Sequence, residues 1–245
     1  MLDFDPETFG ALNADDYDAL HDPGTTEESV ALIAELAGKG RILELAIGTG
    51  RMALPLAKPC FAISGIEGSA AMVEKLREKP GGADIPVVIG DMADCAIDGD
   101  FEFAFLVFNT LFNLTSQDAQ VRCFRHVADR LVPGGGFLVE TFVPDFSGYH
   151  DNQSMRTTQI GFKSLWFEAK IHDPTRQVIQ YQRVRITEGG TKLVPLVMRY
   201  AWPQEMDLMA ELGGLMLEHR WGGWKREPFT PECRMHVSLY RKSAD

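Results

Sequence analysis

Residues 41–53, Arg41-Ile-Leu-Glu-Leu-Ala-Ile-Gly48-Thr-Gly50-Arg-Met-Ala53, join an apolar strand pattern to a glycine-rich turn and then to a helical pattern. Gly48 and Gly50 let the backbone turn sharply and come close to a ligand, because glycine has no Cβ. Ala53 is small enough for the following helix to pack on the strand. The spacing fits G-x-G-x-x-A, so this turn predicts a site for a nucleotide-like ligand.

The residues around the turn supply the context that such a short motif needs. Residues 42–45 are strand-like, residues 51–57 are compatible with a helix, and Glu67 follows the next apolar run. An acid at that position can accept hydrogen bonds from ribose hydroxyls. This context favours a bound ribose over the alternative, a glycine-rich turn that holds no ligand.

Glu44 distinguishes two cofactor classes that share the turn, dinucleotides and S-adenosylmethionine (SAM). A carboxylate inside a buried parallel strand is unfavourable unless it is paired, and dinucleotide folds usually place an aliphatic side chain there. A cationic ligand would compensate this charge. Residues 43–50, LELAIGTG, resemble motif I of the class I SAM-dependent methyltransferases, in which an acidic residue precedes x-G-x-G-x-G. Ala46 stands where that family most often has its first glycine.

The resemblance implies further cofactor contacts at the ends of later strands. Glu67 and Gly68 stand at the family's ribose-binding position, and Asp91 and Met92 stand at its adenine-binding position. Asp91 alone could equally cap a helix. Residues 107–112 occupy the motif IV position, near the reactive methyl group. The implied cofactor-binding residues are Tyr17, Glu44, Ala46, Gly48, Gly50, Glu67, Gly68, Asp91, Met92, Phe108 and Asn109.

The N-terminal segment is expected to cover this site. Residues 9–21 predict a short lid helix, and Tyr17 would reach the cofactor with its hydroxyl or with its ring near the sulfonium; packing on the core is the alternative. Residues 1–38 contain ten acidic and no basic side chains, whereas residues 156–199 contain eight basic and three acidic ones. The basic residues either lie on solvated strands or receive the acidic segment or an anionic substrate.

The strand and helix patterns predict one α/β domain with a doubly wound, Rossmann-like, mostly parallel seven-stranded sheet. An antiparallel β-meander of three strands, which would cap the site, is inserted after the fifth strand. The Leu131–Gly135 turn, LVPGG, matches the family's L-x-P-G-G turn before that strand. The predicted parts are a lid and helix at 1–38, a SAM-binding core at 40–145, a cap at 156–202, and a terminal helix with closing strands at 203–245.

Composition narrows the location and the partners. The net charge of −11 gives no basic surface for nucleic acid, and no apolar run is long enough to cross a membrane. The four cysteines have no C-x-x-C spacing, which predicts a reducing, cytoplasmic location and no metal site. We expect a small-molecule substrate and no nucleic-acid or membrane partner, and the oligomeric options include a homodimer.

The resemblance narrows further to methyltransferases that modify N or O atoms of amino sugars and other natural products. Methyl transfer from a sulfonium needs mainly positioning, and one polar residue near the methyl group is expected. The candidates are Asn109, Asn113, Glu140 and His150, and none of them is assigned as catalytic. An aromatic substrate wall is expected from Phe112, Phe142, Tyr149, Trp166 and Phe167.

Three alternatives remain open at this point. A protein or RNA methyltransferase would need a basic, partner-sized surface, and the absence of an Asn/Asp-Pro-Pro-aromatic tetrad in motif IV disfavours an enzyme of nucleic-acid bases. An NAD-type Rossmann oxidoreductase shares the glycine turn. A regulator that binds SAM without turnover is the third.

Overall fold

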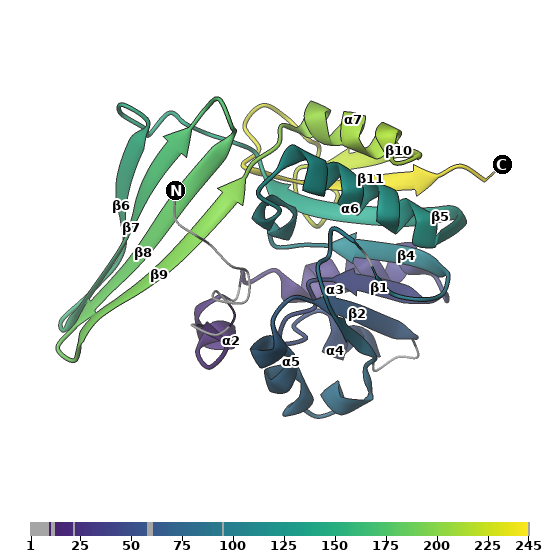
Figure 1. The fold of residues 1–245 in the computed structure, drawn as a ribbon, viewed down its shortest axis with the longest axis horizontal. Helices are drawn as coiled ribbons and strands as arrows, with labels where there is room; N and C mark the ends of the chain where they lie inside the picture. Colours follow the sequence, from purple (N-terminus) through teal and green to yellow (C-terminus); the bar gives the residue numbers. More distant parts are fainter. Residues whose placement is uncertain (1–9, 11–12, 22, 58–60, 95, 245) are drawn as a thin grey trace.

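The computed structural model describes residues 10, 13–21, 23–57, 61–94 and 96–244. It contains two β-sheets, which Figure 1 shows side by side. The larger sheet has the strand order β10-β11-β5-β4-β1-β2-β3. Its strands are β1 (Ile42–Leu45), β2 (Ile63–Glu67), β3 (Val87–Ile89), β4 (Phe101–Leu106), β5 (Leu131–Phe142), β10 (Leu215–Trp221) and β11 (Met235–Lys242).

The first five strands pair in parallel, and β11 runs antiparallel to both of its neighbours. Strands β1 and β2 are buried along their whole length, as expected for a parallel sheet with both faces covered. The predicted seven-stranded, Rossmann-like fold is confirmed. The predicted fifth strand, 137–142, proves to be longer, because β5 begins at Leu131.

Helices cover both faces of this sheet and build two apolar cores. One core lies under α3 (Thr26–Ala37), α4 (Ala53–Ala57) and α5 (Ala70–Arg77), and the other lies under α6 (Gln117–Arg130) and α7 (Pro203–Leu212). Alternate residues of β4 serve the two cores: Phe103 and Phe105 belong to the first, and Ala104 and Leu106 to the second. Helices of the same chain therefore cover both apolar faces of the larger sheet.

Local signals fix where two of these helices begin. The Ser69 Oγ accepts a hydrogen bond from the Met72 N–H at the start of α5. The Ser116 Oγ does the same for the Ala119 N–H at the start of α6. Such caps satisfy backbone donors that the first helical turn leaves free. They place the helix N-termini at the carboxyl edge of the sheet.

The second sheet is the cap, an antiparallel meander of four strands in the order β6-β7-β8-β9. Its strands are β6 (Gln153–Gly161), β7 (Ser164–Asp173), β8 (Val178–Thr187) and β9 (Gly190–Arg199). The prediction of a meander after the fifth strand is confirmed, but the prediction of three strands is wrong. Strand β6 is an exposed edge strand with a mostly polar sequence, so it lacks the apolar alternation that marked the other three.

Candidate cofactor and substrate site

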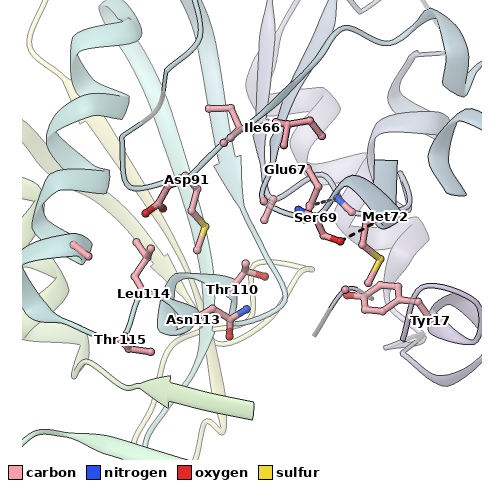
Figure 2. A pocket seen from close by; sticks show the side chains of 18 of the residues that line it. Tyr17, Ile66, Glu67, Ser69, Met72, Asp91, Thr110, Asn113, Leu114 and Thr115 are labelled. Atoms are coloured by element: carbon pink, nitrogen blue, oxygen red, sulfur yellow. Dashed lines mark hydrogen bonds between the residues drawn. The ribbon is translucent and has the colours of Figure 1, made fainter. Parts of the chain in front are cut away.

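A pocket with a volume of about 470 Å³ opens at the carboxyl ends of β1, β2 and β3. Ligand sites in open α/β sheets lie at this edge. Figure 2 shows Tyr17 of α2 (Tyr17–Leu20) on one side of the pocket and Asp91 on the other. The lining residues are Gly10, Tyr17, Ala46, Gly48, Ile66, Glu67, Gly68, Ser69, Met72, Ile89, Gly90, Asp91, Met92, Thr110, Asn113, Leu114, Thr115, Ser116 and Ala119.

The two glycines of the turn have different surroundings. A Cβ on Gly48 would meet nothing nearer than the Ala46 carbonyl oxygen at 4.0 Å, so the backbone of Gly48 is open to the pocket. A Cβ on Gly50 would lie 2.4 Å from the Leu76 Cδ1, and Gly50 does not line the pocket. Gly50 therefore allows close packing of the turn, and Gly48 leaves room for a ligand.

Ala46 lines the pocket in a left-handed conformation, with φ 53°. This conformation costs a non-glycine residue about 1–2 kcal/mol, and glycine adopts it freely. It explains on physical grounds why the matching position in motif I is most often glycine. The alanine keeps the same turn at the expense of some backbone strain.

Glu67 links the glycine turn to the end of β2. Its Oε2 accepts from the Gly48 N–H at 2.8 Å, and its Oε1 accepts from the Ser69 N–H at 2.9 Å. Burial raises the pKa of Glu67, and the backbone N–H donors oppose that rise. Each carboxylate oxygen keeps a second lone pair for hydroxyl donors, because an ionised carboxylate can accept about four hydrogen bonds.

Glu44 lies two residues before the pocket-lining Ala46 but does not itself line the pocket. Its side chain is buried, and its Oε2 has no hydrogen-bond partner among the described residues. Burial raises the pKa of Glu44 well above its usual value, and the nearby Arg51 charge opposes this rise. A buried carboxyl oxygen without a partner costs roughly 1–3 kcal/mol. This orphaned oxygen beside the glycine turn fits a ligand that carries an ammonium group.

Asp91 and Met92 follow β3 and line the opposite side of the pocket. The Asp91 Oδ1 accepts from the Ala93 N–H at 2.8 Å, so the carboxylate caps a turn as well as facing the pocket. The Met92 side chain is buried, with 9% of its surface exposed. An acceptor beside a soft apolar side chain suits an adenine ring with its amino group.

Phe108 and Asn109 do not line the pocket, unlike seven of the other sequence-predicted residues. Both have a φ of 63°, and both are tied to β5. The Glu140 Oε2 accepts from the Phe108 N–H at 2.5 Å, and the Asn109 Oδ1 accepts from the Phe142 N–H at 2.5 Å. This clamp holds the following 3₁₀ turn, η2 (Thr110–Asn113), against the pocket. A direct cofactor contact for Phe108 and Asn109 stays a prediction.

Sequence reasoning missed several residues that the structure brings to the pocket. Thr115 and Ser116 line it after η2 and at the start of α6. The predicted motif IV stretch, 107–112, includes the pocket-lining Thr110 but ends three residues before Thr115. Asn113, one of the polar candidates, does line the pocket.

The other polar candidates lie elsewhere. His150 is exposed in the turn before β6. Glu140 is buried and engaged with the Phe108 N–H, and burial raises its pKa to about 7. The expected aromatic wall is not a single surface. Trp166 and Phe167 are neighbours on β7 and so point to opposite faces of the cap.

The lid is held from two sides by its acidic residues. The Asp18 carboxylate lies 2.5 Å from the Lys79 Nζ and 2.6 Å from the Thr49 Oγ1, beside the glycine turn. On the cap side, the Asp16 carboxylate lies 3.8 Å from an Arg185 nitrogen and 3.5 Å from the Lys192 Nζ. The basic residues in 156–199 had two interpretations. For Arg185 and Lys192, the second one, docking of the acidic N-terminal segment, therefore applies.

The described lid helix, α2, is shorter than the predicted one, and Phe9, Ala11 and Leu12 of that prediction lie outside the described residues. Tyr17 stacks on His21, with the ring centroids 4.7 Å apart. Burial raises the pKa of Tyr17 to about 12. Burial, followed by the Arg183 charge, lowers the pKa of His21, whose Nε2 lies 2.9 Å from an Arg183 nitrogen. The neutral Tyr17 ring therefore lines the lid side of the pocket, and His21 stacks on it.

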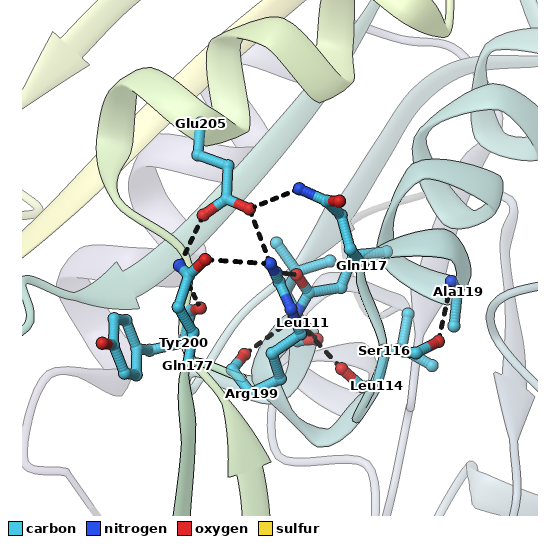
Figure 3. Close-up of polar contacts among 10 residues, drawn as sticks. Leu111, Leu114, Ser116, Gln117, Ala119, Gln177, Arg199, Tyr200 and Glu205 are labelled. Carbon is cyan, nitrogen blue, oxygen red and sulfur yellow. Dashed lines mark hydrogen bonds and ion pairs between the residues drawn. The ribbon is translucent and has the colours of Figure 1, made fainter. Parts of the chain in front are cut away.

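A buried polar network joins the cap to the pocket wall (Figure 3). Arg199, at the end of β9, donates to the Gln120 Oε1 at 2.6 Å and to the Glu205 Oε1 at 2.7 Å. The Gln120 Nε2 donates in turn to the carbonyls of Leu111 and Leu114, on either side of Asn113. The network therefore fixes η2 relative to the cap.

The fold and the pocket together define a class I SAM-dependent methyltransferase. The residues present fit SAM, since the orphaned Glu44 oxygen suits its ammonium group, the open backbone at Gly48 leaves room for it, and Glu67 retains acceptor capacity.

Comparisons with known proteins agree with this class. The family described as "Methyltransferase domain" matches residues 42–135. The CcbJ methyltransferase of Streptomyces caelestis has a solved structure that is 35% identical, with a TM-score of 0.92, over 98% of this chain and 100% of that one. The chain therefore belongs to the SAM-dependent methyltransferases.

Two further similarities concern parts of the chain or the fold alone. A curated relative, the putative methyltransferase YqeM of Bacillus subtilis (strain 168), is 31% identical over 110 residues, which span 44% of either protein. SAM-bound CalS10, an amino pentose methyltransferase of Micromonospora echinaspora, is 16% identical, with a TM-score of 0.68, over 93% of this chain and 94% of that one. At that identity the second similarity supports the fold only.

Other features of the described residues add little to the site. None of their His, Cys, Asp and Glu side chains cluster in a way that could hold a metal ion. No helix in the described part of the chain is long and apolar enough to span a membrane. Cys123 is buried and Cys233 is partly buried, while Cys60 and Cys95 lie outside the described residues.

Proposed function

We propose that this methyltransferase transfers the methyl group of SAM to an N or O atom of a small molecule held between the lid, η2 and the cap. The observation that carries the proposal is the buried Glu44 oxygen without a partner, two residues before the pocket-lining Ala46. A dinucleotide has no ammonium group to donate to that oxygen, since the charged pyridinium nitrogen of NAD⁺ carries no hydrogen, whereas the amino-acid part of SAM has one.

The cofactor-binding roles follow from the chemistry of the lining. Glu44 and the open backbone at Gly48 would hold the amino-acid end, Glu67 the ribose hydroxyls, and Asp91 with Met92 the adenine. Tyr17 would cover the cofactor from the lid. Gly50, Phe108 and Asn109 would act indirectly, by shaping the turn and the η2 wall.

Bound SAM supplies an electrophilic methyl group with a neutral thioether as the leaving group. The residues of this chain therefore act mainly by positioning the two reactants, which can account for about 7–11 kcal/mol of the barrier. Thr110 and Asn113 present polar side chains at the pocket and would orient the acceptor atom. Glu140 is engaged with the Phe108 N–H, which favours a positioning role over that of a general base.

The covered site supports a small substrate. The lid and the cap are joined across the pocket by the contacts of Asp16 with Arg185 and Lys192, which leave little room for a macromolecule. Its neighbour CalS10 acts on an amino pentose, so an amine-bearing sugar is the first substrate class to test. We also propose a cytoplasmic location, which the spacing of the four cysteines in the sequence supports, because it shows no disulfide pattern.

Incubation with SAM that carries a labelled methyl group, and with a panel of amino sugars and phenols, tests the proposal. We expect label in a small product whose mass rises by one methylene unit, and none with the Gly48→Val protein. Label found only in added protein or RNA would contradict a small-molecule substrate. Label in no acceptor, together with tight SAM binding, would instead favour a regulator.

A further inference from the structure

The two faces of the cap sheet differ sharply in chemistry. Cross-strand register places Trp166, Glu168 and Lys170 on the same face as Arg183 and Arg185. This charged face holds the lid, through the contacts of Asp16 and His21. The residues between them in sequence point to the opposite face, because successive side chains of a strand alternate.

That opposite face is apolar and largely exposed. The register aligns Ile160, Leu165 and Ile186 in one row and Phe167, Val184 and Leu193 in the next. Six large apolar side chains of this face remain exposed: Met155 (72%), Ile160 (79%), Leu165 (38%), Ile171 (56%), Ile186 (41%) and Leu193 (54%). We call these six residues, with Phe167 and Val184, the apolar cap face.

No charged side chain interrupts the apolar cap face. The other positions of this side that lie among these residues hold neutral side chains: Gln153, Thr157, Ala169, Gln180, Gln182, Thr191 and Pro195. The charged residues of this side, Asp173 and Arg199, lie at its core-proximal end, where Val178, Val197 and Arg199 are buried. One apolar face of an antiparallel sheet is normally packed on another layer. Here the described part of the chain supplies no such layer, because the side chains stay exposed. A contiguous exposed apolar patch of this kind marks an interaction surface.

We infer that the apolar cap face is the interface between two copies of this chain. A two-fold dimer places the same patch against itself, so any charge on the patch would meet its own copy. The chain carries a net charge of −11, and ten of its acidic residues, with no Lys or Arg, lie in residues 1–38, so two copies repel each other most where their N-terminal segments approach. The uncharged cap face is a surface on which a second copy meets no such repulsion.

The size of the face also suits a dimer. Four strands about 4.8 Å apart, with about eight residues each outside the buried end of the sheet at about 3.4 Å per residue, cover roughly 520 Å². Two such faces packed together would bury about 1,000 Å², the area that a specific interface needs. The packing would resemble a β-sandwich, with the two sheets about 10 Å apart. The charged face and the pocket would stay open on the other side of each cap.

The mass of the protein in solution tests this inference without use of the proposed catalytic function. We would compare wild type, Ile171→Glu/Ile186→Glu, and a control, Leu208→Glu/Leu212→Glu, by sedimentation equilibrium. The control changes two equally exposed leucines of α7, with 60% and 64% exposure. Wild type and control should both have twice the 27.3 kDa chain mass at 20 µM. The cap variant should have the single-chain mass, with a dissociation constant raised at least 100-fold.

Circular dichroism and SAM titration of the same samples check that the cap variant is folded. Neither Ile171 nor Ile186 lines the pocket, so its SAM affinity should match that of wild type. A wild-type protein that is monomeric at 100 µM would overturn the inference. So would a folded cap variant that still dimerises as tightly as wild type.

Discussion

The core sheet and the cap sheet are both built from amphipathic or apolar strands, but they leave different groups unsatisfied. Helices cover both faces of the core sheet, and the notable unmet group near its carboxyl edge is one carboxyl oxygen of Glu44. The cap sheet turns a charged face to the lid and exposes the opposite apolar face. The core sheet therefore leaves a place for a positively charged group of a ligand. The cap sheet leaves a place for another layer of protein.

This difference shows how the kind of unmet group indicates the kind of partner. A single buried polar atom needs one well-placed counterpart, which a small ligand can supply. A broad apolar surface needs area, which only another folded surface supplies. The two sheets meet at the network of Arg199, Gln120 and Glu205, so this network lets the partners of each sheet influence the other.

Arg199→Met should have the largest effect on stability, because it breaks the junction between the two sheets. Arg199 is 5% exposed, and its loss leaves the Gln120 Oε1 without its donor and leaves the Glu205 charge with only the neutral amides of Gln117 and Gln177. Removal of one partner of a buried ion pair costs about 3–5 kcal/mol. Urea unfolding measures this loss. Lys163→Met, in the exposed Lys163–Glu188 pair, is the control and should cost less than about 1 kcal/mol. Equal effects of the two variants would contradict a structural junction.

Gly48→Val should abolish SAM binding while the fold survives. The new side chain would project into space that is open to the pocket, and the expected loss of about 1,000-fold in affinity corresponds to about 4 kcal/mol. Gly134→Val is a matched control, since Gly134 also has a positive φ and no atom near its Cβ position, but lies outside the pocket lining. Titration calorimetry compares them. Unchanged affinity in the Gly48 variant would mean that the turn does not contact the cofactor.

Glu140→Gln should flatten the pH dependence of stability. Burial raises the pKa of Glu140 to about 7 in the folded protein, above its usual 4.5. Such a group penalises the folded state as pH rises from 4.5 through 7, by about 3 kcal/mol in total. Wild type should therefore lose stability between pH 5 and pH 8 in urea unfolding, and the variant should lose less. Glu211→Gln, at an exposed position of α7, should keep the wild-type slope. A Glu140→Gln profile parallel to that of wild type would refute the assigned pKa.

Asp18→Asn should have the smallest effect, because it weakens only the lid. Asp18 is about half exposed and pairs with Lys79 beside the glycine turn. Exposed pairs contribute about 0.2–1 kcal/mol, so SAM affinity should fall by at most about fivefold. The difference from wild type should shrink at 1 M salt, since salt screens exposed charges. Asp118→Asn, in an exposed pair on α6, should leave SAM affinity unchanged. A salt-independent loss would indicate that Asp18 acts by another contact.

The core fold and most of the pocket were predictable because their signals are local. The glycine turn at Gly48 and the strands with continuous apolar runs depend on residues close in sequence. The cofactor-binding positions Glu67, Asp91 and Met92 follow strands, and strand ends in a parallel sheet meet at one edge. These positions could therefore be inferred without contacts distant in sequence.

The remaining features depend on pairing between distant segments. Strand β6 is polar and forms only through its partner β7, so its sequence has no strand periodicity of its own. The clamp from Glu140 to Phe108 joins residues 32 apart and decides that η2, rather than Asn109, faces the pocket. The prediction of an aromatic wall was wrong for a simpler reason. Trp166 and Phe167 are neighbours on one strand, and such neighbours point to opposite faces of a sheet.

Titration of the wild-type protein and of Glu44→Gln with SAM and with NAD⁺ tests the central claim most directly. We predict saturable binding of one SAM per chain, no binding of NAD⁺, and SAM affinity at least tenfold weaker in Glu44→Gln, because the amide cannot balance the ligand's positive charge. Tight NAD⁺ binding without SAM binding, or equal SAM affinity in the two proteins, would contradict the account.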